Sequence, residues 1–240
     1  MCDRWMPTIK LGITWEQFQQ LPRNPAYNYE YVDGQACLTP RTRHYHALLD
    51  LKPLDLSADV KIRRVENRDF PELERLFAAS FARIQPYGSL DDATRLRAAT
   101  DALERTRGGG DGPWIERASF VALEQERFVG AIFITLLPPG DPCDWDSYRW
   151  TESPPADWLK RAYGRPHLTW IFVSPLAAGH GTGTTLLAAA VRELLAMGYK
   201  ELASTFIVGN DSSMLWHWRN GFRLLSYPTS HRRTREKKKR

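Results

Sequence analysis

The segment from Val173 to Gly183, V-S-P-L-A-A-G-H-G-T-G, constrains the fold of this 240-residue chain more than any other. An apolar run over residues 167–173 predicts a strand, which ends before Pro175. Three glycines follow at alternate positions, and a helical pattern begins at Thr184. A glycine-rich turn between a strand and a helix gathers backbone N–H groups at the helix N-terminus, where an anion such as phosphate binds.

The glycine spacing excludes two common phosphate-binding loops. A P-loop requires G-x-x-x-x-G-K-[ST], and no lysine follows Gly183. A dinucleotide-binding loop requires G-x-G-x-x-G. Counted from Gly179 its last glycine falls on Thr184, and counted from Gly181 it falls on Leu186. The pattern that remains is either a loop for another phosphate ligand or an ordinary glycine-rich turn.

A second motif follows further along the chain. Residues 210–222 read N-D-S-S-M-L-W-H-W-R-N-G-F and come after an apolar run over 202–208. This order predicts a strand and then a short helix closed by Gly221-Phe222. Together the two motifs resemble the GNAT superfamily of acyl-CoA N-acyltransferases, over residues from about 59 to 227. The resemblance implies that the loop N–H groups hold the pyrophosphate of coenzyme A.

The pattern along the chain predicts a mixed α/β fold. From residue 60 onward, segments with strand and helix periodicity follow in the order βααββ, an insertion, then βαβαβ. The resemblance implies the same class, a GNAT-like mixed central sheet flanked by helices. We expect an N-terminal helix-hairpin module at 1–57, the acyltransferase domain at 58–228 and a basic, disordered tail at 229–240.

The N-terminal residues predict a small helix-hairpin appendage. Thr14-Trp-Glu-Gln17 has the spacing of a capping box. Asp33-Gly34 lies between two strand-like runs and predicts a hairpin with a type I′ turn. His44 and His46 follow, and no third metal ligand is evident nearby, so we interpret them as strand or loop histidines.

The resemblance assigns the acyl donor, acetyl-CoA, to the strand and turn around Val173. The strand-edge backbone of Phe172 and Val173 would pair with the amide-rich pantetheine arm. The turn would hold the pyrophosphate, aided by the helix dipole. Its residues are Gly179, His180, Gly181, Thr182, Gly183 and Thr184. The family commonly has Arg or Gln at position 178, so Ala178 leaves binding mainly to the backbone.

Three further residues align with positions that act in the family. His167 stands where many members have a glutamate that serves as general base, and an imidazole suits that role near neutral pH. His217 stands in place of a tyrosine that acts as general acid. Asn210 would orient the pantetheine arm. The alternatives are, in turn, a hydrogen-bonded histidine at a strand end, a helix histidine packed among tryptophans and a helix N-cap.

Two segments without periodicity interrupt the domain. Residues 107–113, R-G-G-G-D-G-P, predict a flexible loop. Residues 138–166 are rich in proline, aspartate and tryptophan, and long connections of this kind tend to be functional or disordered. The tryptophans argue against disorder. This insertion is therefore either a lid over the acceptor substrate or an ordered surface segment.

The formal net charge of +5 comes from the last ten residues. They hold seven Lys or Arg and one Glu, so the remainder of the chain carries a net charge of −1. We predict a solvated tail, with weak contact to nucleic acid or anionic lipid as the alternative. Three cysteines without a C-x-x-C motif favour a reducing cytoplasm, and no apolar run is long enough to span a membrane.

These features predict an acetyl-CoA-dependent N-acetyltransferase, in which a primary amine attacks the thioester directly within a ternary complex. The amine can belong to a small molecule or a peptide, because acceptor pockets are built from variable loops. The alternative is a CoA-binding domain of the same family that has lost catalysis and acts in regulation or as a scaffold. That alternative arises because the usual Arg or Gln, Glu and Tyr are all replaced here.

Overall fold

The computed structural model describes residues 9–22, 27–40, 44–55, 58–144, 148–207 and 210–225. The expected tail at 229–240 and Trp145 of the insertion lie outside these ranges. The disorder of the tail and its contact with nucleic acid therefore stay predictions. Within the described ranges, no helix is both long and apolar enough to cross a membrane.

The N-terminal part forms a helix and a sheet of its own. Its elements are β1 (Ile9–Leu11), α1 (Trp15–Gln20), β2 (Tyr27–Val32) and β3 (Gln35–Pro40), with the strands ordered β1-β3-β2. The predicted capping box is present, since Thr14 and Gln17 each bond the other's backbone N–H. Asp33 and Gly34 have φ of 50° and 74°, the positive values that a type I′ turn requires.

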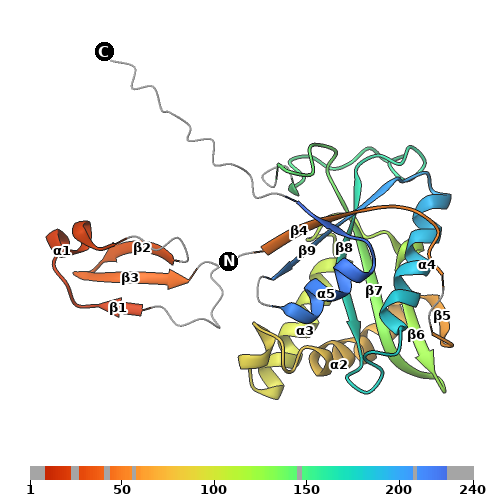
Figure 1. The fold of residues 1–240 in the computed structure, drawn as a ribbon, viewed down its shortest axis with the longest axis horizontal. Coiled ribbons are helices and arrows are strands. Elements are labelled where there is room, and N and C mark those ends of the chain that lie inside the picture. Colours follow the sequence, from red (N-terminus) through yellow and green to blue (C-terminus); the bar gives the residue numbers. More distant parts are fainter. Residues whose placement is uncertain are drawn as a thin grey trace, which may run out of the picture.

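The second sheet has seven strands in the order β10-β4-β9-β8-β7-β6-β5 (Figure 1). Its strands are β4 (His44–Asp50), β5 (Lys61–Arg64), β6 (Phe120–Glu124), β7 (Arg127–Leu137), β8 (Arg165–Val173), β9 (Glu201–Ile207) and β10 (Arg223–Leu224). Neighbouring strands are antiparallel except for β8 and β9, which are parallel. The sheet is therefore mixed, as the sequence predicts.

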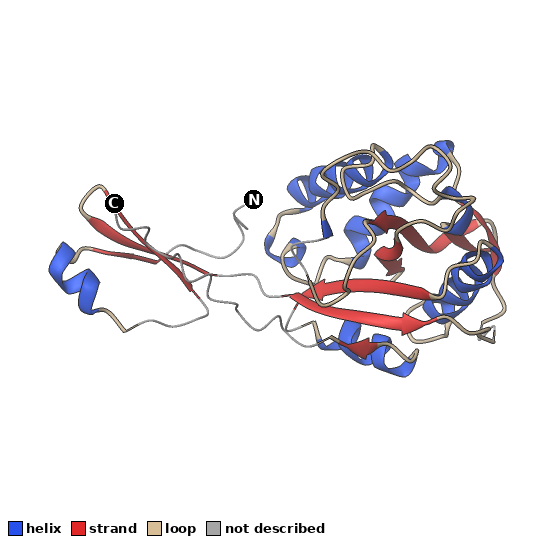
Figure 2. Cartoon of the chain, turned by 90° about the horizontal axis from the view of Figure 1, so that it is seen from above, coloured by secondary structure: helices blue, strands red, loops and turns tan. Residues whose placement is uncertain are grey.

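Helices cover both faces of this sheet (Figure 2). They are α2 (Phe70–Ser80), α3 (Asp92–Arg107), α4 (Thr182–Ala196) and α5 (Asp211–Arg219), with short 3₁₀ turns η1 (Asn67–Asp69), η2 (Tyr87–Ser89) and η3 (Glu116–Ala118). Val121 and Phe133 pack with α2 and α3, whereas Ala122 and Ile132 pack with α4. Because alternate strand residues point to opposite faces, α2 and α3 cover one face and α4 the other.

The strand β4 lies within residues 1–57, the range expected for the N-terminal module, but it is a strand of the large sheet. It pairs antiparallel with β9 along its whole length and with β10 on its other edge. Ala47, Leu48 and Leu49 are all buried. Residues 44–50 therefore belong to the large sheet. A strand buried on both faces lacks the alternation of a half-buried one, so the sequence indicates only an apolar run here.

The strands β8 and β9 separate soon after they meet. Their parallel pairing is confined to two registers, His167↔Ala203 and Leu168↔Ser204. On the other edge of β8, the register with β7 skips Thr169, which is the extra residue of a bulge. Beyond these points β8 continues to Val173 beside β7 alone. We call the space between the diverging parts of β8 and β9 the β8–β9 wedge.

The glycine-rich loop after α3, expected to be flexible, is held by backbone hydrogen bonds. The Gly110 N–H donates to the Arg105 carbonyl at 2.8 Å. The Leu136 N–H of β7 donates to the Pro113 carbonyl at 2.9 Å. These bonds tie the loop to α3 at one end and to β7 at the other. They place Asp111 between the helix and the sheet.

The insertion between β7 and β8 packs against the large sheet. The Trp150 Nε1–H donates to the Leu136 carbonyl at 2.7 Å, and Trp158 packs on the core beneath α4. Tyr148 lies edge-on to His46 of β4, with ring centroids 5.2 Å apart. These aromatic side chains hold the described part of the insertion against the sheet. A role as a lid stays a prediction.

Gly112→Ala should lower the free energy of unfolding by about 2 kcal/mol or more. The residue has a φ of 97°, and a Cβ there would lie 2.2 Å from the Leu136 carbonyl oxygen, so the loop or β7 must move. Gly109→Ala is the matched control, because its φ is 79° but the nearest atom would lie 4.0 Å away. That control should cost only about 1 kcal/mol. Urea unfolding compares the two, and equal losses would contradict the steric argument.

Candidate active site

The N-terminus of α4 forms the predicted anion-binding turn. Gly179 and Gly181 both have a φ of 85°, a left-handed conformation that favours glycine. The first intrahelical hydrogen bond runs from the Thr185 N–H to the Gly181 carbonyl at 2.9 Å. The N–H groups of residues 182–184 precede it, so the helix itself offers them no acceptor. Together with the positive end of the helix dipole, they suit a phosphate group.

The side chains around the turn differ in their exposure. Thr182 is buried, Thr184 is half-buried and His180 is exposed. A Cβ on Gly183 would lie 3.1 Å from Nε1 of Trp216, so this tryptophan of α5 lies directly against the first turn of α4. The turn is therefore a tightly packed corner between two helices. Its available donors are backbone N–H groups, the Thr184 hydroxyl and the His180 imidazole.

The strand before the turn offers backbone to the β8–β9 wedge. Phe172 is buried and points its ring toward Phe133 at a centroid distance of 6.2 Å, on the α2 side of the sheet. Val173 is half-buried, and its carbonyl accepts a hydrogen bond from the Ser80 hydroxyl at 2.9 Å. Within the described residues, β8 beyond Leu168 pairs with β7 but not with β9. Both predicted residues therefore lie beside the wedge.

A polar cluster lies at the closed end of the wedge. His167 Nδ1 lies 3.1 Å from the Thr169 hydroxyl, and its Nε2 lies 3.1 Å from the Thr205 hydroxyl of β9. The second bond joins β8 to β9 just past their last backbone pair. Burial lowers the pKa of His167 to about 3, with smaller contributions from His46 and His217. The imidazole is therefore neutral near pH 7, the form in which a base accepts a proton.

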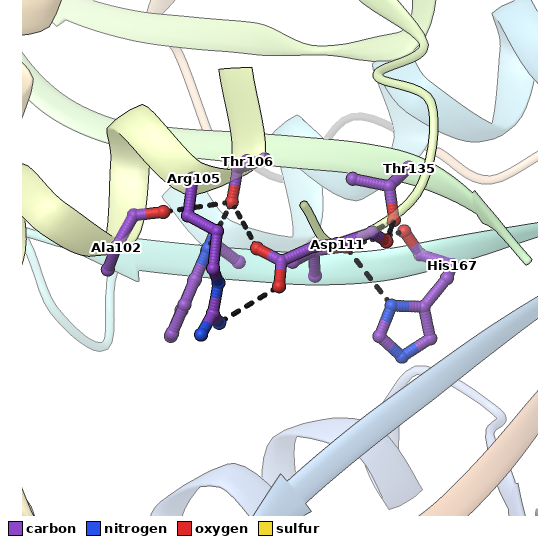
Figure 3. Close-up of polar contacts among 8 residues, drawn as sticks. Ala102, Arg105, Thr106, Asp111, Thr135 and His167 are labelled. Carbon is purple, nitrogen blue, oxygen red and sulfur yellow. Dashed lines mark hydrogen bonds and ion pairs between the residues drawn. The ribbon is translucent and has the colours of Figure 1, made fainter. Parts of the chain in front are cut away.

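The cluster continues to α3 through Asp111 (Figure 3). The Asp111 carboxylate accepts a hydrogen bond from the Thr106 hydroxyl at 2.7 Å and pairs with Arg105 at 2.9 Å. The Asp111 backbone carbonyl accepts from the Thr135 hydroxyl of β7 at 3.0 Å. The hydroxyl oxygens of Thr135 and Thr169 lie 2.8 Å apart. Helix α3 and the central strands are thus joined by one hydrogen-bonded network.

The two predicted catalytic histidines lie on opposite faces of the sheet. His217 Nε2 lies 2.8 Å from the Ser204 hydroxyl, whereas His167 bonds to Thr205. Ser204 and Thr205 are consecutive in β9, so their side chains point to opposite faces. The structure therefore does not bring His167 and His217 together in one cluster.

Both ring nitrogens of His217 are engaged in hydrogen bonds. Nδ1 lies 2.7 Å from the Ser213 carbonyl, which can only accept, so Nδ1 carries the proton. Burial lowers the pKa of His217 to about 4, and the bond to Ser213 opposes this in part. Its ring stacks on Phe206 at 4.2 Å between centroids. This neutral, packed imidazole favours the structural alternative over a general acid.

Asn210 occupies the N-cap of α5. Its side-chain oxygen accepts a hydrogen bond from the Ser213 N–H at 3.1 Å. The N-cap alternative therefore accounts for this residue, since caps of this kind stabilise a helix start by about 1 kcal/mol. A contact between Asn210 and pantetheine stays a prediction.

Sequence reasoning missed most of the polar network. His46 Nδ1 lies 3.2 Å from the Thr205 hydroxyl, although we interpret His46 from the sequence as an ordinary strand histidine. Within the described residues, no group of three or more His, Cys, Asp or Glu side chains is arranged to hold a metal ion. The threonines carry one signal, because Thr135, Thr169 and Thr205 each interrupt an apolar strand. Polar side chains in such strands need hydrogen-bond partners.

The family follows from a comparison with known sequences. Residues 85–222 match the model of the acetyltransferase (GNAT) family, which is more than half of the chain, and the chain belongs to this family. The resemblance drawn from the turn and the second motif is confirmed. Membership assigns acyl transfer from coenzyme A to the chain in general terms. No curated protein matches the chain.

Several solved structures are similar to this chain. A GNAT family acetyltransferase from Brucella melitensis, solved with acetyl-CoA, has a TM-score of 0.46 and 17% identity over 71% of this chain and 89% of its own. PaiA N-acetyltransferase from Thermoplasma acidophilum, solved with coenzyme A, has a TM-score of 0.46 and 14% identity over 69% and 90%. AAC(6')-Iy, solved with a bisubstrate analog, has a TM-score of 0.43 and 20% identity over 72% and 99%.

The free energy of unfolding should fall as the pH drops below the ordinary histidine value of 6.5, because His217 has a pKa of about 4 when folded. The unfolded chain binds a proton first, so this imidazole should cost about 2 kcal/mol of stability at pH 5. His217→Asn keeps a donor for the Ser213 carbonyl but does not titrate, so its stability should vary less with pH. His180→Asn, on the exposed turn, is the control. Identical pH slopes for His217→Asn and wild type would refute the argument.

Proposed function

We propose that this chain is an acetyl-CoA-dependent N-acetyltransferase that acetylates a primary amine by direct attack within a ternary complex. The observation that carries the proposal is the β8–β9 wedge, whose β8 side leads into the turn at the N-terminus of α4. A ligand can lie along β8 and end at that helix. This matches coenzyme A, which has an amide-rich arm and a pyrophosphate.

The proposed binding uses backbone groups in two ways. The pantetheine amides pair with β8 along the wedge, as an added strand would. The pyrophosphate accepts hydrogen bonds from the N–H groups of residues 182–184, with the Thr184 hydroxyl and His180 beside them. Ala178 is exposed and contributes no charge, so affinity depends mainly on the backbone of the turn.

The proposed reaction forms an amide and releases a thiol. The amine nitrogen attacks the thioester carbonyl carbon, the N–C bond forms and the C–S bond breaks. The proton lost by the nitrogen passes to His167, which is neutral near pH 7 because burial holds its pKa low. Water supplies the proton to the departing thiolate, since His217 is neutral and engaged on both nitrogens.

The acceptor amine is proposed to bind next to the closed end of the wedge, where β8 and β9 are paired. His167 and Thr205 lie there, and the insertion contacts the neighbouring strand β4 through Tyr148 and His46. This position supports the insertion as a cover over the acceptor. The amine belongs to a small molecule or a peptide. The described cysteines Cys37 and Cys143 are free, which fits a reaction in a reducing cytoplasm.

Gly179→Asp should weaken acetyl-CoA binding about tenfold relative to Gly179→Asn, a difference of about 1.4 kcal/mol. Both residues tolerate a positive φ, and an added Cβ at position 179 meets nothing within 4 Å. The two side chains have similar shapes, so the pair isolates a negative charge beside the pyrophosphate. Titration calorimetry gives the two dissociation constants. Equal values would show that the turn does not hold the anion.

Acetyl-CoA with a panel of primary amines should give free thiol and N-acetylated product in equal amounts, measured by thiol release and mass spectrometry. For an accepted amine, kcat/KM should rise with pH as the amine loses its proton, with no inflection from His167 between pH 5 and 8. His167→Gln should lower kcat about 100-fold and leave acetyl-CoA affinity unchanged. Coenzyme binding without turnover on any amine would favour the non-catalytic CoA-binding alternative.

A further inference from the structure

A chain of hydrogen bonds crosses four adjacent strands of the large sheet. It leads from the Asp111 carbonyl to His46 of β4, on the face covered by α3. Its successive distances are 3.0 Å from Asp111 O to Thr135 Oγ1, 2.8 Å to Thr169 Oγ1, 3.1 Å to His167 Nδ1, 3.1 Å from His167 Nε2 to Thr205 Oγ1 and 3.2 Å to His46 Nδ1. Each threonine has one hydrogen to donate, so the chain can be assigned a direction.

The direction is set at the Asp111 end. A backbone carbonyl only accepts, so the Thr135 hydroxyl donates its hydrogen to Asp111. The hydroxyl oxygens of Thr169 and Thr135 lie 2.8 Å apart, a distance that requires a hydrogen between them. Thr135 has already used its hydrogen, so Thr169 is the donor. The other acceptor near the Thr169 hydroxyl, the His167 carbonyl, lies farther away at 3.4 Å. The Thr169 hydrogen is therefore used on Thr135.

The assignment passes from there through His167. Because the Thr169 hydroxyl has no second hydrogen, it accepts from His167, so Nδ1 carries the proton. In the neutral ring Nε2 is then the acceptor, and Thr205 donates to it. Thr205 in turn accepts from His46, whose Nδ1 carries the proton. Every hydrogen in the chain has one position.

We propose that this chain is a positioning device for the base: it fixes His167 as the Nδ1–H tautomer, and His46 holds the Thr205 hydroxyl turned toward Nε2. The inference rests on the proposed acetyl transfer. When the N–C bond forms, the nitrogen gives its proton to the Thr205 oxygen as the Thr205 hydrogen moves to His167 Nε2. The amine loses one proton, His167 gains one and the threonine is unchanged. Thr205 is thus a relay, and His46 a positioning residue.

His46 would be missed by any comparison limited to the family-matched region. That region spans residues 85–222, whereas β4 lies before it and enters the sheet beside β9. Burial and the neighbouring His44 lower the pKa of His46 to about 4, so it is neutral near pH 7. A neutral imidazole can hold its proton at Nδ1, as the assigned chain requires. The N-terminal strand therefore completes the network around the base.

The tautomers can be read without any substrate by ¹⁵N NMR of histidine-labelled, full-length protein. Wild type near neutral pH should show protonated Nδ1 and unprotonated Nε2 for His167 and His46. Thr135→Val removes the acceptor for Thr169, so His167 should become a mixture of tautomers. Thr135→Ser restores the hydroxyl and should restore the single tautomer. An Nε2–H tautomer of His167 in wild type, or an unchanged tautomer in Thr135→Val, would contradict the assigned direction of the hydrogen bonds.

Kinetics then test the relay on an accepted amine. Thr205→Val should lower kcat about 100-fold with KM for acetyl-CoA unchanged, and Thr205→Ser should recover most of the rate. His46→Phe keeps a ring beside Tyr148 but loses the donor, so kcat should fall about tenfold. His46→Asn places an amide N–H near Nδ1 and should retain activity. His44→Asn, on the same strand, is the control.

The NMR tautomers and the kinetic constants together distinguish a failure of the relay from a failure of the proposed function. Wild-type kcat in both Thr205→Val and His46→Phe would overturn the relay, whatever the tautomers are. If no amine accepts an acetyl group, the proposed function fails, and the NMR result alone decides whether the chain has the assigned direction. Circular dichroism of each variant shows whether a lost rate reflects a lost fold.

Discussion

The separation of β8 from β9 is the constraint on which the rest of the site depends. Backbone N–H and C=O groups inside a sheet need partners, and two parallel strands that pair at only two registers leave such groups facing the wedge. At the closed end, side chains take over from the backbone, because His167 on β8 bonds to Thr205 on β9. Along the open part, a ligand with its own amides can supply the missing partners. In the proposed function, the same geometry provides a path for the cofactor and places an imidazole at the end of that path.

Features that depend on neighbouring residues could be predicted from the sequence. The glycine-rich turn before α4, the capping box at Thr14 and the turn at Asp33 follow from local turn chemistry, and each is present. From residue 60 onward, the order of strands and helices also follows from periodicity, whereas the place of β4 in the large sheet does not. The glycine spacing excludes the two other common phosphate-binding loops. The family resemblance then indicates that the ligand of this turn is coenzyme A.

Features that depend on distant residues could not be predicted in this way. His46 and Thr205 are hydrogen-bonded although 159 positions separate them, and no local sequence pattern predicts that contact. The loop around Asp111 is rich in glycine, which usually indicates flexibility, but its carbonyl and N–H groups are used by α3 and β7. The sequence also does not show which face of the sheet each side chain of β9 points to. Alignment by motif proposes His167 and His217 as a pair, whereas the register of Ser204 and Thr205 separates them.

The low pKa of His167 is compatible with its proposed role as a base that acts late in the reaction. Burial lowers the pKa of this imidazole to about 3, and the nearby Asp111 carboxylate is already paired with Arg105. Among the described residues, this carboxylate is thus neutralised at the closed end of the wedge, and an amine that enters as proposed would be favoured there in its neutral form. A neutral amine can attack the thioester without first losing a proton. Only when the N–C bond has formed does the nitrogen become positively charged and strongly acidic, and at that point even a weak base can take the proton. In the proposed reaction, burial would therefore favour the neutral, nucleophilic amine, and His167 would take the proton only after the N–C bond has formed.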